Sequence, residues 1–286
     1  MNAMKSINAI SVTSHVRDWL ASSHRPRILH IFDNACNLIN ERREVISIVT
    51  PPIGNGPFNL VVEDIVCFSE RLSPISSIFV SDSKLTLGNL TIQIADANLW
   101  KPRPNWEYLH GNRDKIVHQL MKLSLPTHPL LLPQSLALAP HASACVSNLS
   151  LALANKDLSS ALKITSQLAG LGAGLTPAGD DFVMGAIHAV WIIHPLEVAS
   201  TLTQSIADTA APLTTSLSAA WLRSAGQGEA GALWHQFFET LVGRVDNPAY
   251  LQEALDNILS VGETSGADAL AGFMSTLSYS IAQSNL

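Results

Sequence analysis

The chain has 286 residues, of which 47% are hydrophobic and only 14% are charged. This low share of charged residues, against about 25% in typical domains, predicts compact units and excludes an intrinsically disordered chain. The net charge is −6 and no run of lysines and arginines occurs, which excludes nucleic acid as a partner.

The three cysteines lie far apart, and none belongs to a CxxC or Cys/His cluster. They favour reduced thiols in a cytoplasmic protein over a disulfide framework or a structural zinc site. The N-terminus lacks the apolar core of a signal peptide, and no run of about 18 apolar residues could span a bilayer. We expect a cytoplasmic protein without a membrane partner.

The first hundred residues are predicted to be mainly β. Short runs of β-branched and aromatic residues, separated by turn residues, predict strands at 27–32, 45–49, 59–68, 78–80 and 90–94. One helix, around residues 12–21, is expected to precede these strands. Short strands at this spacing favour a small barrel or a sandwich.

The composition changes after Trp100, where the segment KPRPNW contains two prolines that interrupt regular structure. We place a domain boundary there, with a mainly β domain at 1–106 and an all-α domain at 107–286. Apolar residues then recur every three or four positions. They predict helices near 112–123, 135–154, 157–169, 180–193, 197–211, 214–225, 231–242, 248–261 and 265–284. The expected fold is α+β, with a tightly packed helical bundle.

A glycine-rich segment, GLGAGLTPAGDD at residues 170–181, is the first motif. Its alternating glycines permit positive φ and close backbone approach. Thr176 is expected to cap the following helix, with Pro177 as its first residue. Helix N-terminal amides attract anions, so Gly172, Gly174, Thr176 and Gly179 are predicted to bind a small anionic metabolite. No Lys-Ser/Thr pair follows, so the motif is not a P-loop.

Asp180 and Asp181 follow directly in the first turn of the predicted helix. They are candidates for magnesium ligands or for acid–base catalysis, with stabilisation of the helix dipole as the structural alternative. Consecutive helical residues diverge by about 100°, so both side chains cannot face the same way. One is expected to point into the site while the other caps or pairs.

A second motif, GETSGAD at residues 262–268, resembles the first. Thr264 or Ser265 is expected to cap the last helix and Gly266 to let the backbone approach a ligand, while Asp268 takes the place of Asp180. Two such loop-to-helix elements could face each other across one site. The hydroxyl-rich segment 214–218 is expected to cap a helix or to contact the substrate.

The two motifs, GLGAGLTPAGDDFVMG and VGETSGADALAGF, resemble those of the H-subunit family of oxamate carbamoyltransferase. The β-rich start with its Gly-Pro turn and Trp100 is also similar, so the resemblance covers roughly residues 25–284. It implies a role in anaerobic allantoin degradation, where a multi-subunit enzyme phosphorolyses oxalurate to oxamate and carbamoyl phosphate. It transfers no catalytic residue to this chain.

Three hypotheses follow. The first is a carbamoyltransferase subunit that binds a small anion, in which Asp180 or Asp181, together with Asp268, orients an amide nitrogen or a magnesium ion. The second is a stand-alone magnesium-dependent hydrolase of a phosphate-containing substrate. The third is a non-catalytic scaffold or ligand-sensing subunit. The sequence assigns no certain cofactor and leaves magnesium as an option, and the expected partners are other subunits, with a homo-oligomer as a further option.

Overall fold

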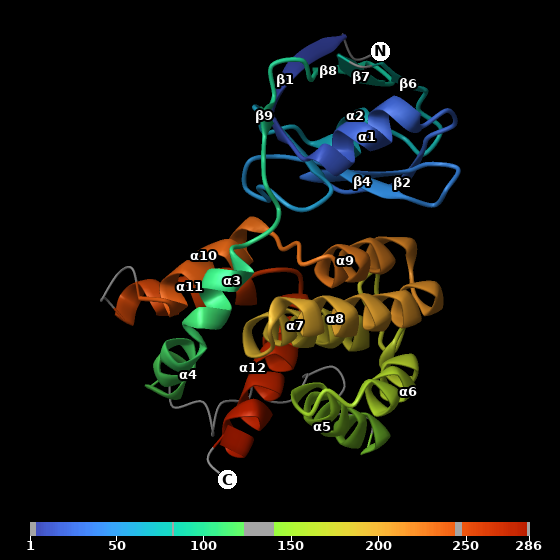
Figure 1. The fold of residues 1–286 in the computed structure, drawn as a ribbon. Helices are drawn as coiled ribbons and strands as arrows, with labels where there is room; N and C mark the ends of the chain where they lie inside the picture. The colour runs from blue at the N-terminus through green and yellow to red at the C-terminus, as the bar shows by residue number, and fades with distance from the viewer. Residues whose placement is uncertain (1–3, 82, 123–139, 244–247, 285–286) are drawn as a thin grey trace. The chain divides into compact units, whose positions relative to one another are not determined.

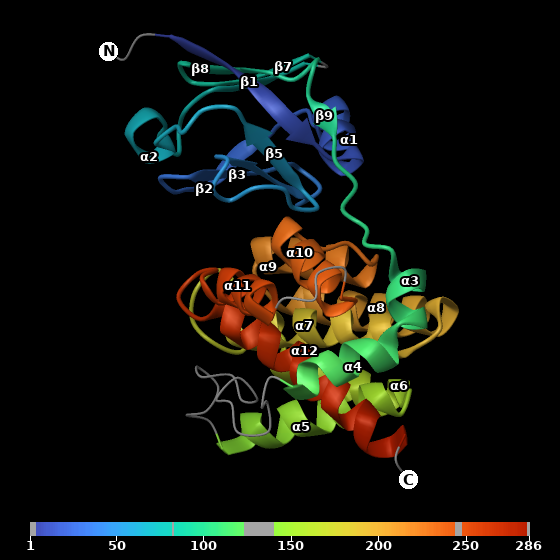
Figure 2. The ribbon, with the colours of Figure 1, turned by 90° about the vertical axis from the view of Figure 1, so that its left-hand side faces the viewer.

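The computed structural model describes residues 4–81, 83–122, 140–243 and 248–284. The chain divides into two compact units, Met1–Pro102 and Arg103–Leu286, and each has its own hydrophobic core (Figures 1 and 2). The first unit contains mainly strands and the second contains helices, so the predicted α+β class is confirmed.

The N-terminal unit is a nine-stranded, nearly closed, barrel-like sheet. Its strand order is β2-β3-β4-β5-β1-β8-β7-β6, and β9 pairs with β1 outside this path. The strands are β1 (Lys5–Val12), β2 (Arg27–Ile31), β3 (Ala35–Ile39), β4 (Val45–Val49), β5 (Asn59–Val62), β6 (Ile78–Val80), β7 (Lys84–Leu87), β8 (Leu90–Gln93) and β9 (Asn98–Leu99).

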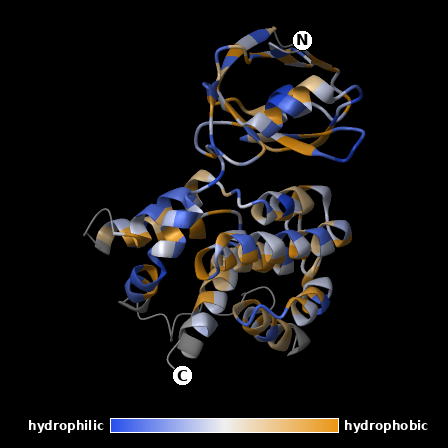
Figure 3. Ribbon diagram, in the orientation of Figure 1, coloured by the Kyte–Doolittle hydropathy of each residue, from blue (hydrophilic) through white to orange (hydrophobic). Residues whose placement is uncertain are grey.

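Strand β1 joins the two halves of this sheet. It pairs antiparallel with β5 and parallel with both β8 and β9. Two helices, α1 (Ser14–Ser22) and α2 (Phe68–Arg71), contribute Trp19 and Phe68 to the core that the strands enclose. Figure 3 shows hydrophobic residues (orange) running through these strands and through the helices of the second unit.

Several strand predictions are confirmed and others are wrong. The strands at 45–49 and 78–80 match to the residue, whereas β1, β3, β7 and β9 were not predicted. Strand β1 alternates buried and exposed residues. Because the residues on its exposed face are mostly polar, the segment does not stand out as a run of β-branched and aromatic residues. The predicted strand 59–68 ends at Val62, because the chain turns before α2 begins. The predicted first helix begins at Ser14, and β1 precedes it.

The second unit consists of packed helices, and most of them match the predicted ranges to within a few residues. They are α3 (Trp106–Gly111), α4 (Arg113–Lys122), α5 (Pro140–Ala154), α6 (Leu158–Leu168), α7 (Ala178–Ile193), α8 (Leu196–Ala210), the 3-10 turn η3 (Ala211–Leu213), α9 (Ser216–Gly226), α10 (Ala232–Leu241), α11 (Pro248–Leu259) and α12 (Ser265–Ser284). None of the helices described is long and apolar enough to cross a membrane. Residues 135–139 of one predicted helix lie outside the described residues.

Helix α7 lies at the centre of this unit, and all of its residues except Met184 are buried. A helix that is apolar on every side is typical of a core position. Helix α12 crosses α7 at very short range, and both views show the two helices side by side (Figures 1 and 2). This crossing sets the positions of the two motifs.

Two glycines, one on each helix, permit the close crossing of α7 and α12. A Cβ added at Gly185 would lie 1.7 Å from the carbonyl oxygen of Ala269, and one added at Gly272 would lie 1.9 Å from that of Phe182. The two contacts mirror each other, because Gly185 faces α12 as Gly272 faces α7. The crossing therefore has a local pseudo-two-fold symmetry, and only glycine at both positions permits this backbone separation.

Candidate functional site

The helix crossing brings the two motifs into contact. The hydroxyl groups of Thr176 and Ser265 lie 2.9 Å apart and share a hydrogen bond. The first residue precedes α7 and the second begins α12, so the bond joins the starts of the two central helices. The expectation that the two loop-to-helix elements face each other therefore agrees with the observed contact.

The glycine-rich part of the first motif takes a conformation that favours glycine. Gly170, Gly172 and Gly174 have φ angles of 73°, 122° and 96°. A Cβ at Gly172 would lie 2.8 Å from the amide nitrogen of Ala178, whereas nothing outside the loop lies within 4 Å of a Cβ at Gly174. The N–H groups of Gly172, Ala173 and Gly174 donate to no group of the described residues. These amides are available to a ligand.

The start of α7 differs from the prediction in its capping. Pro177 occupies the N-cap position and has no hydrogen-bonding group in its side chain, so no side chain caps the helix, and the Thr176 hydroxyl shares a hydrogen bond with Ser265. The Gly179 amide is not available to an anion, since it donates to the carbonyl oxygen of Leu171 over 2.9 Å. Of the amides that the sequence predicted to bind an anion, that of Gly179 therefore already has an acceptor, whereas those of Gly172 and Gly174 have none among the described residues.

Gly179 and Gly266 both serve close packing of a helix start against the preceding helix. A Cβ at Gly179 would lie 2.0 Å from the carbonyl oxygen of Leu168, and one at Gly266 would lie 1.8 Å from that of Ile258. Gly266 also donates its amide to Val261. The structure gives these two glycines a packing role, which the sequence pattern could not distinguish from close approach to a ligand.

The Asp180 carboxylate ties the first motif to the start of α9. It accepts hydrogen bonds from the Gly170 amide at 2.9 Å, from the Ser218 hydroxyl at 2.8 Å and from the Thr214 hydroxyl. Burial raises the pKa of Asp180, while the hydrogen bonds from Thr214, Gly170 and Ser218 oppose the shift. Both carboxylate oxygens are occupied, so Asp180 acts as a brace of the loop.

The hydroxyl-rich segment around α9 supports the same loop. Thr215 caps α9 by accepting the Ser218 amide, and its hydroxyl donates to the carbonyl oxygen of Leu175. The capping expectation for residues 214–218 agrees with this geometry.

Asp181 points the other way, toward the start of α12. Its side chain is 5% exposed, and its Oδ2 atom has no hydrogen-bond partner among the described residues. Its pKa is raised to about 8, chiefly by burial and less by the charges of Asp268 and Asp180, while hydrogen bonds from the Ser265 and Thr176 hydroxyls oppose the shift. Asp181 is therefore largely a neutral carboxylic acid at neutral pH. The expected divergence of the two neighbouring aspartates agrees with these contacts.

The helix crossing also corrects the alignment of the two motifs. Gly185 and Gly272 make equivalent contacts, and so do Gly179 and Gly266. The number of residues that separates the first pair is the same as the number that separates the second. The same spacing relates Asp181, and not Asp180, to Asp268. The sequence comparison was out of register by one residue, because the loop of the first motif is longer. Asp268 is completely buried, and it is the equivalent of Asp181 on the partner helix.

The acidic groups do not form a metal site within the part of the chain that the structure describes. No group of three His, Cys, Asp or Glu side chains there could hold a metal ion. Magnesium prefers carboxylate and other oxygen ligands in near-octahedral geometry, and the Asp180 oxygens already accept three hydrogen bonds. The donor set does not fit the magnesium role considered from the sequence.

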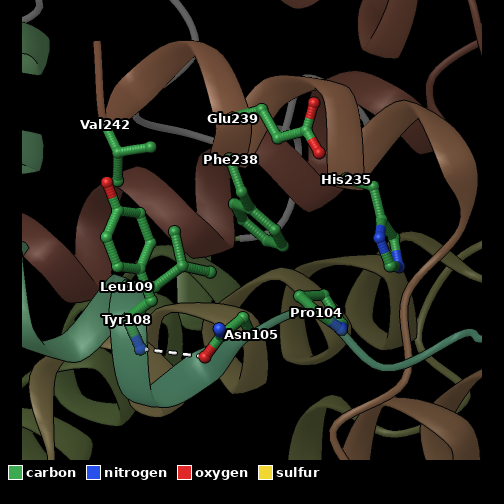
Figure 4. Close-up of a pocket in the computed structure, with 8 residues that line it drawn as sticks. All are labelled: Pro104, Asn105, Tyr108, Leu109, His235, Phe238, Glu239 and Val242. Carbon is green, nitrogen blue, oxygen red and sulfur yellow. Dashed lines mark hydrogen bonds between the residues drawn. The ribbon is translucent and has the colours of Figure 1, made fainter. Parts of the chain in front are cut away.

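A surface pocket of about 200 Å³ lies elsewhere in the helical unit, between α3 and α10 (Figure 4). It is lined by Pro104, Asn105, Tyr108, Leu109, His235, Phe238, Glu239 and Val242. None of these residues belongs to either motif. The side chain of Asn105 caps α3 by accepting the Tyr108 amide, so this part of the lining serves helix structure.

Beneath this pocket, His188 lies in an aromatic cluster. Its ring packs 4.9 Å from Trp234, 6.0 Å from Phe238 and 6.1 Å from Trp106 between centroids. Burial lowers its pKa to about 3, with a smaller effect from the charge of His235. His188 is therefore a neutral core residue. No site prediction from the sequence included His188, and the apolar pattern on both sides of it within α7 could have placed it in the core.

The fold and the site define an α+β protein in which a barrel-like unit is followed by a helical unit with two apposed loop-to-helix motifs. Residues 8–99 match the AllH family N-terminal domain, and residues 168–277 match the family described as oxamate carbamoyltransferase subunit AllH. The second match contains both motifs. The chain belongs to the AllH family, which confirms the resemblance seen in the motifs. No solved structure matches the chain.

Proposed function

We propose that this chain is a subunit of a cytoplasmic carbamoyltransferase complex and that its helical unit binds the small anionic substrate. Membership of the family of oxamate carbamoyltransferase subunits supports the complex. The observation that carries the binding site is the hydrogen bond between Thr176 and Ser265, which joins the two motifs around one point. Partner subunits supply the remainder of the enzyme.

The loop of the first motif provides the groups for the anionic end of the substrate. Successive N–H groups in a loop of positive φ form a concave site for carboxylate or phosphate. The amides of Gly172, Ala173 and Gly174 have no acceptor within the described residues, and there is open space at Gly174. Oxamate, oxalurate and carbamoyl phosphate are all small anions that such a site fits.

The other end of each of these molecules is an amide or carbamoyl group. Asp181 and Asp268 border the Thr176–Ser265 pair and provide groups that an amide can hydrogen-bond. In this arrangement the loop amides hold the anion and the two carboxyl groups orient the nitrogen. The pathway that follows from the family is the use of allantoin as a nitrogen source.

Turnover by the reconstituted complex tests this proposal. We expect Thr176→Val, which keeps the side-chain shape but removes the hydroxyl, to lower kcat/KM for carbamoyl transfer by about 10- to 100-fold. The matched control is Thr201→Val on α8, whose exposed hydroxyl donates only to its own helix. Wild-type kcat/KM in a folded Thr176→Val complex would contradict the site.

A further inference from the structure

The Asp181 side chain has a polar atom that the protein itself does not satisfy. Oδ2 is buried and has no hydrogen-bond partner in the described part of the chain, although the residue is only 5% exposed. Leaving a buried polar atom without a partner costs about 1–3 kcal/mol, so such atoms are rare in the interior of folded proteins. An atom of a ligand would supply the missing partner, and the N–H groups of Gly172, Ala173 and Gly174 in the same motif likewise donate to no group of the described residues.

The charges around Asp181 favour its protonated form. Two other carboxyl groups, Asp268 and Asp180, act on it, and no cation is among the groups that shift its pKa. Two buried carboxylates close together repel each other strongly, so one proton is retained. Burial is the largest cause of the raised pKa of Asp181, and the charge of Asp268 adds to it, so the Asp181–Asp268 pair is expected to hold one proton between its two carboxyl groups.

We propose that Asp181 and Asp268, a buried carboxyl pair at the starts of the two crossing helices, form a subsite that accepts the amide end of the substrate and rejects a carboxylate in its place. This inference rests on the proposed function. The O–H of the protonated carboxyl group donates to the amide carbonyl oxygen, and a carboxylate oxygen of the pair accepts the amide N–H. A ligand carboxylate has no N–H to donate, and its charge would lie against that of the pair.

Oxamate and oxalate provide matched probes, because they have nearly the same size and differ by an amide in place of a second carboxylate. We expect calorimetric titration of the full chain near neutral pH to show oxamate binding at least about 10-fold more tightly than oxalate. Equal affinities would overturn the subsite but leave the anion site intact. Absence of binding by both probes would contradict the proposed function, and the subsite with it.

The Asp268→Asn variant tests the source of this discrimination. Removal of a charged group is expected to raise the affinity for oxalate. The ratio of oxamate affinity to oxalate affinity is expected to fall at least about 10-fold. An unchanged preference in this variant would overturn the assignment of Asp268. The control is Asp114→Asn on α4, where the carboxyl group is 95% exposed and both affinities should stay at their wild-type values.

Two substitutions at Asp181 separate a ligand contact from a purely structural role. Asp181→Asn keeps a neutral donor of similar size, so oxamate affinity is expected to stay within a few-fold of wild type. Asp181→Ala removes the donor, and the affinity is expected to fall at least about 10-fold. Near-ultraviolet circular dichroism establishes that both variants are folded. Equal oxamate affinities in folded Asn and Ala variants would overturn the contact.

Discussion

Replacing Gly185 by alanine is expected to destabilise the helical unit severely. The new Cβ would lie 1.7 Å from the carbonyl oxygen of Ala269, which is well inside van der Waals contact. The carbonyl oxygen belongs to the backbone of α12, so no side chain can rotate away to make room for the methyl group. Helices α7 and α12 must therefore separate. Such overpacking typically costs about 1–3 kcal/mol, and this distance places the loss at or above the top of that range.

Gly272→Ala is expected to give the same loss, because its contact with Phe182 mirrors that of Gly185. Urea denaturation followed by circular dichroism measures both. The control is Gly111→Ala at the end of α3, where nothing lies within 4 Å of the added Cβ. It should leave stability unchanged or raise it by up to about 1 kcal/mol. Wild-type stability of the Gly185 variant would contradict the observed helix crossing.

The two neighbouring aspartates are expected to respond to substitution with opposite signs. Asp180→Ala removes the acceptor of three hydrogen bonds and leaves the Ser218 hydroxyl and the Gly170 amide without their partner. The expected loss is about 3–5 kcal/mol of the free energy of unfolding. A native stability of less than about 15 kcal/mol makes this loss a large fraction of the total.

Asp181→Asn is expected to be more stable than the wild type, and the difference in the free energy of unfolding is expected to grow as the pH rises. The pKa of Asp181 is about 8 in the folded chain, against an ordinary value of 3.8, so the folded chain holds a proton that the unfolded chain has lost. Between these values the free energy of unfolding falls by up to about 1.4 kcal/mol per pH unit because of this group. The asparagine variant lacks this penalty, and integrating the slope over the range from 3.8 to about 8 gives an expected gain on the order of 5 kcal/mol at its upper end.

Urea titrations of both variants across this pH range provide the measurement. The difference between Asp181→Asn and wild type should vanish at the acid end, where Asp181 is protonated in both the folded and unfolded chains. A constant difference at every pH would contradict a raised pKa of Asp181. Full stability of Asp180→Ala would contradict the role of Asp180 as a brace of the loop.

Much of the helical unit could be predicted from the sequence, because helix formation there depends on local patterns. The predicted range 265–284 coincides with α12, and the proline at 248 coincides with the start of α11. Strand prediction was weaker, since β3 and β7 pair with neighbours that no local pattern reveals. Pairing between distant segments is a tertiary property, and it decided these elements.

The candidate site was predictable in its location but not in its internal roles. Alternating glycines and a repeated pattern identified both motifs, and helix geometry required the two aspartates to diverge. Two partners of Asp180, Thr214 and Ser218, lie just before α9 and in its first turn, 34 and 38 residues away, and no spacing rule predicts them. The equivalence of Asp181 with Asp268 depends on the helix crossing, so only packing distances could establish it.

The central claim is that the two motifs form one site for a small amide-bearing anion. Titration of oxamate into isotope-labelled chain, followed by the backbone amide signals, tests it most directly. We predict saturable shifts at Gly172, Ala173 and Gly174 and at Ser265 on the opposite motif, with the exposed Gly111 unaffected. Saturable oxamate binding that leaves the signals of both motifs unchanged would contradict the claim.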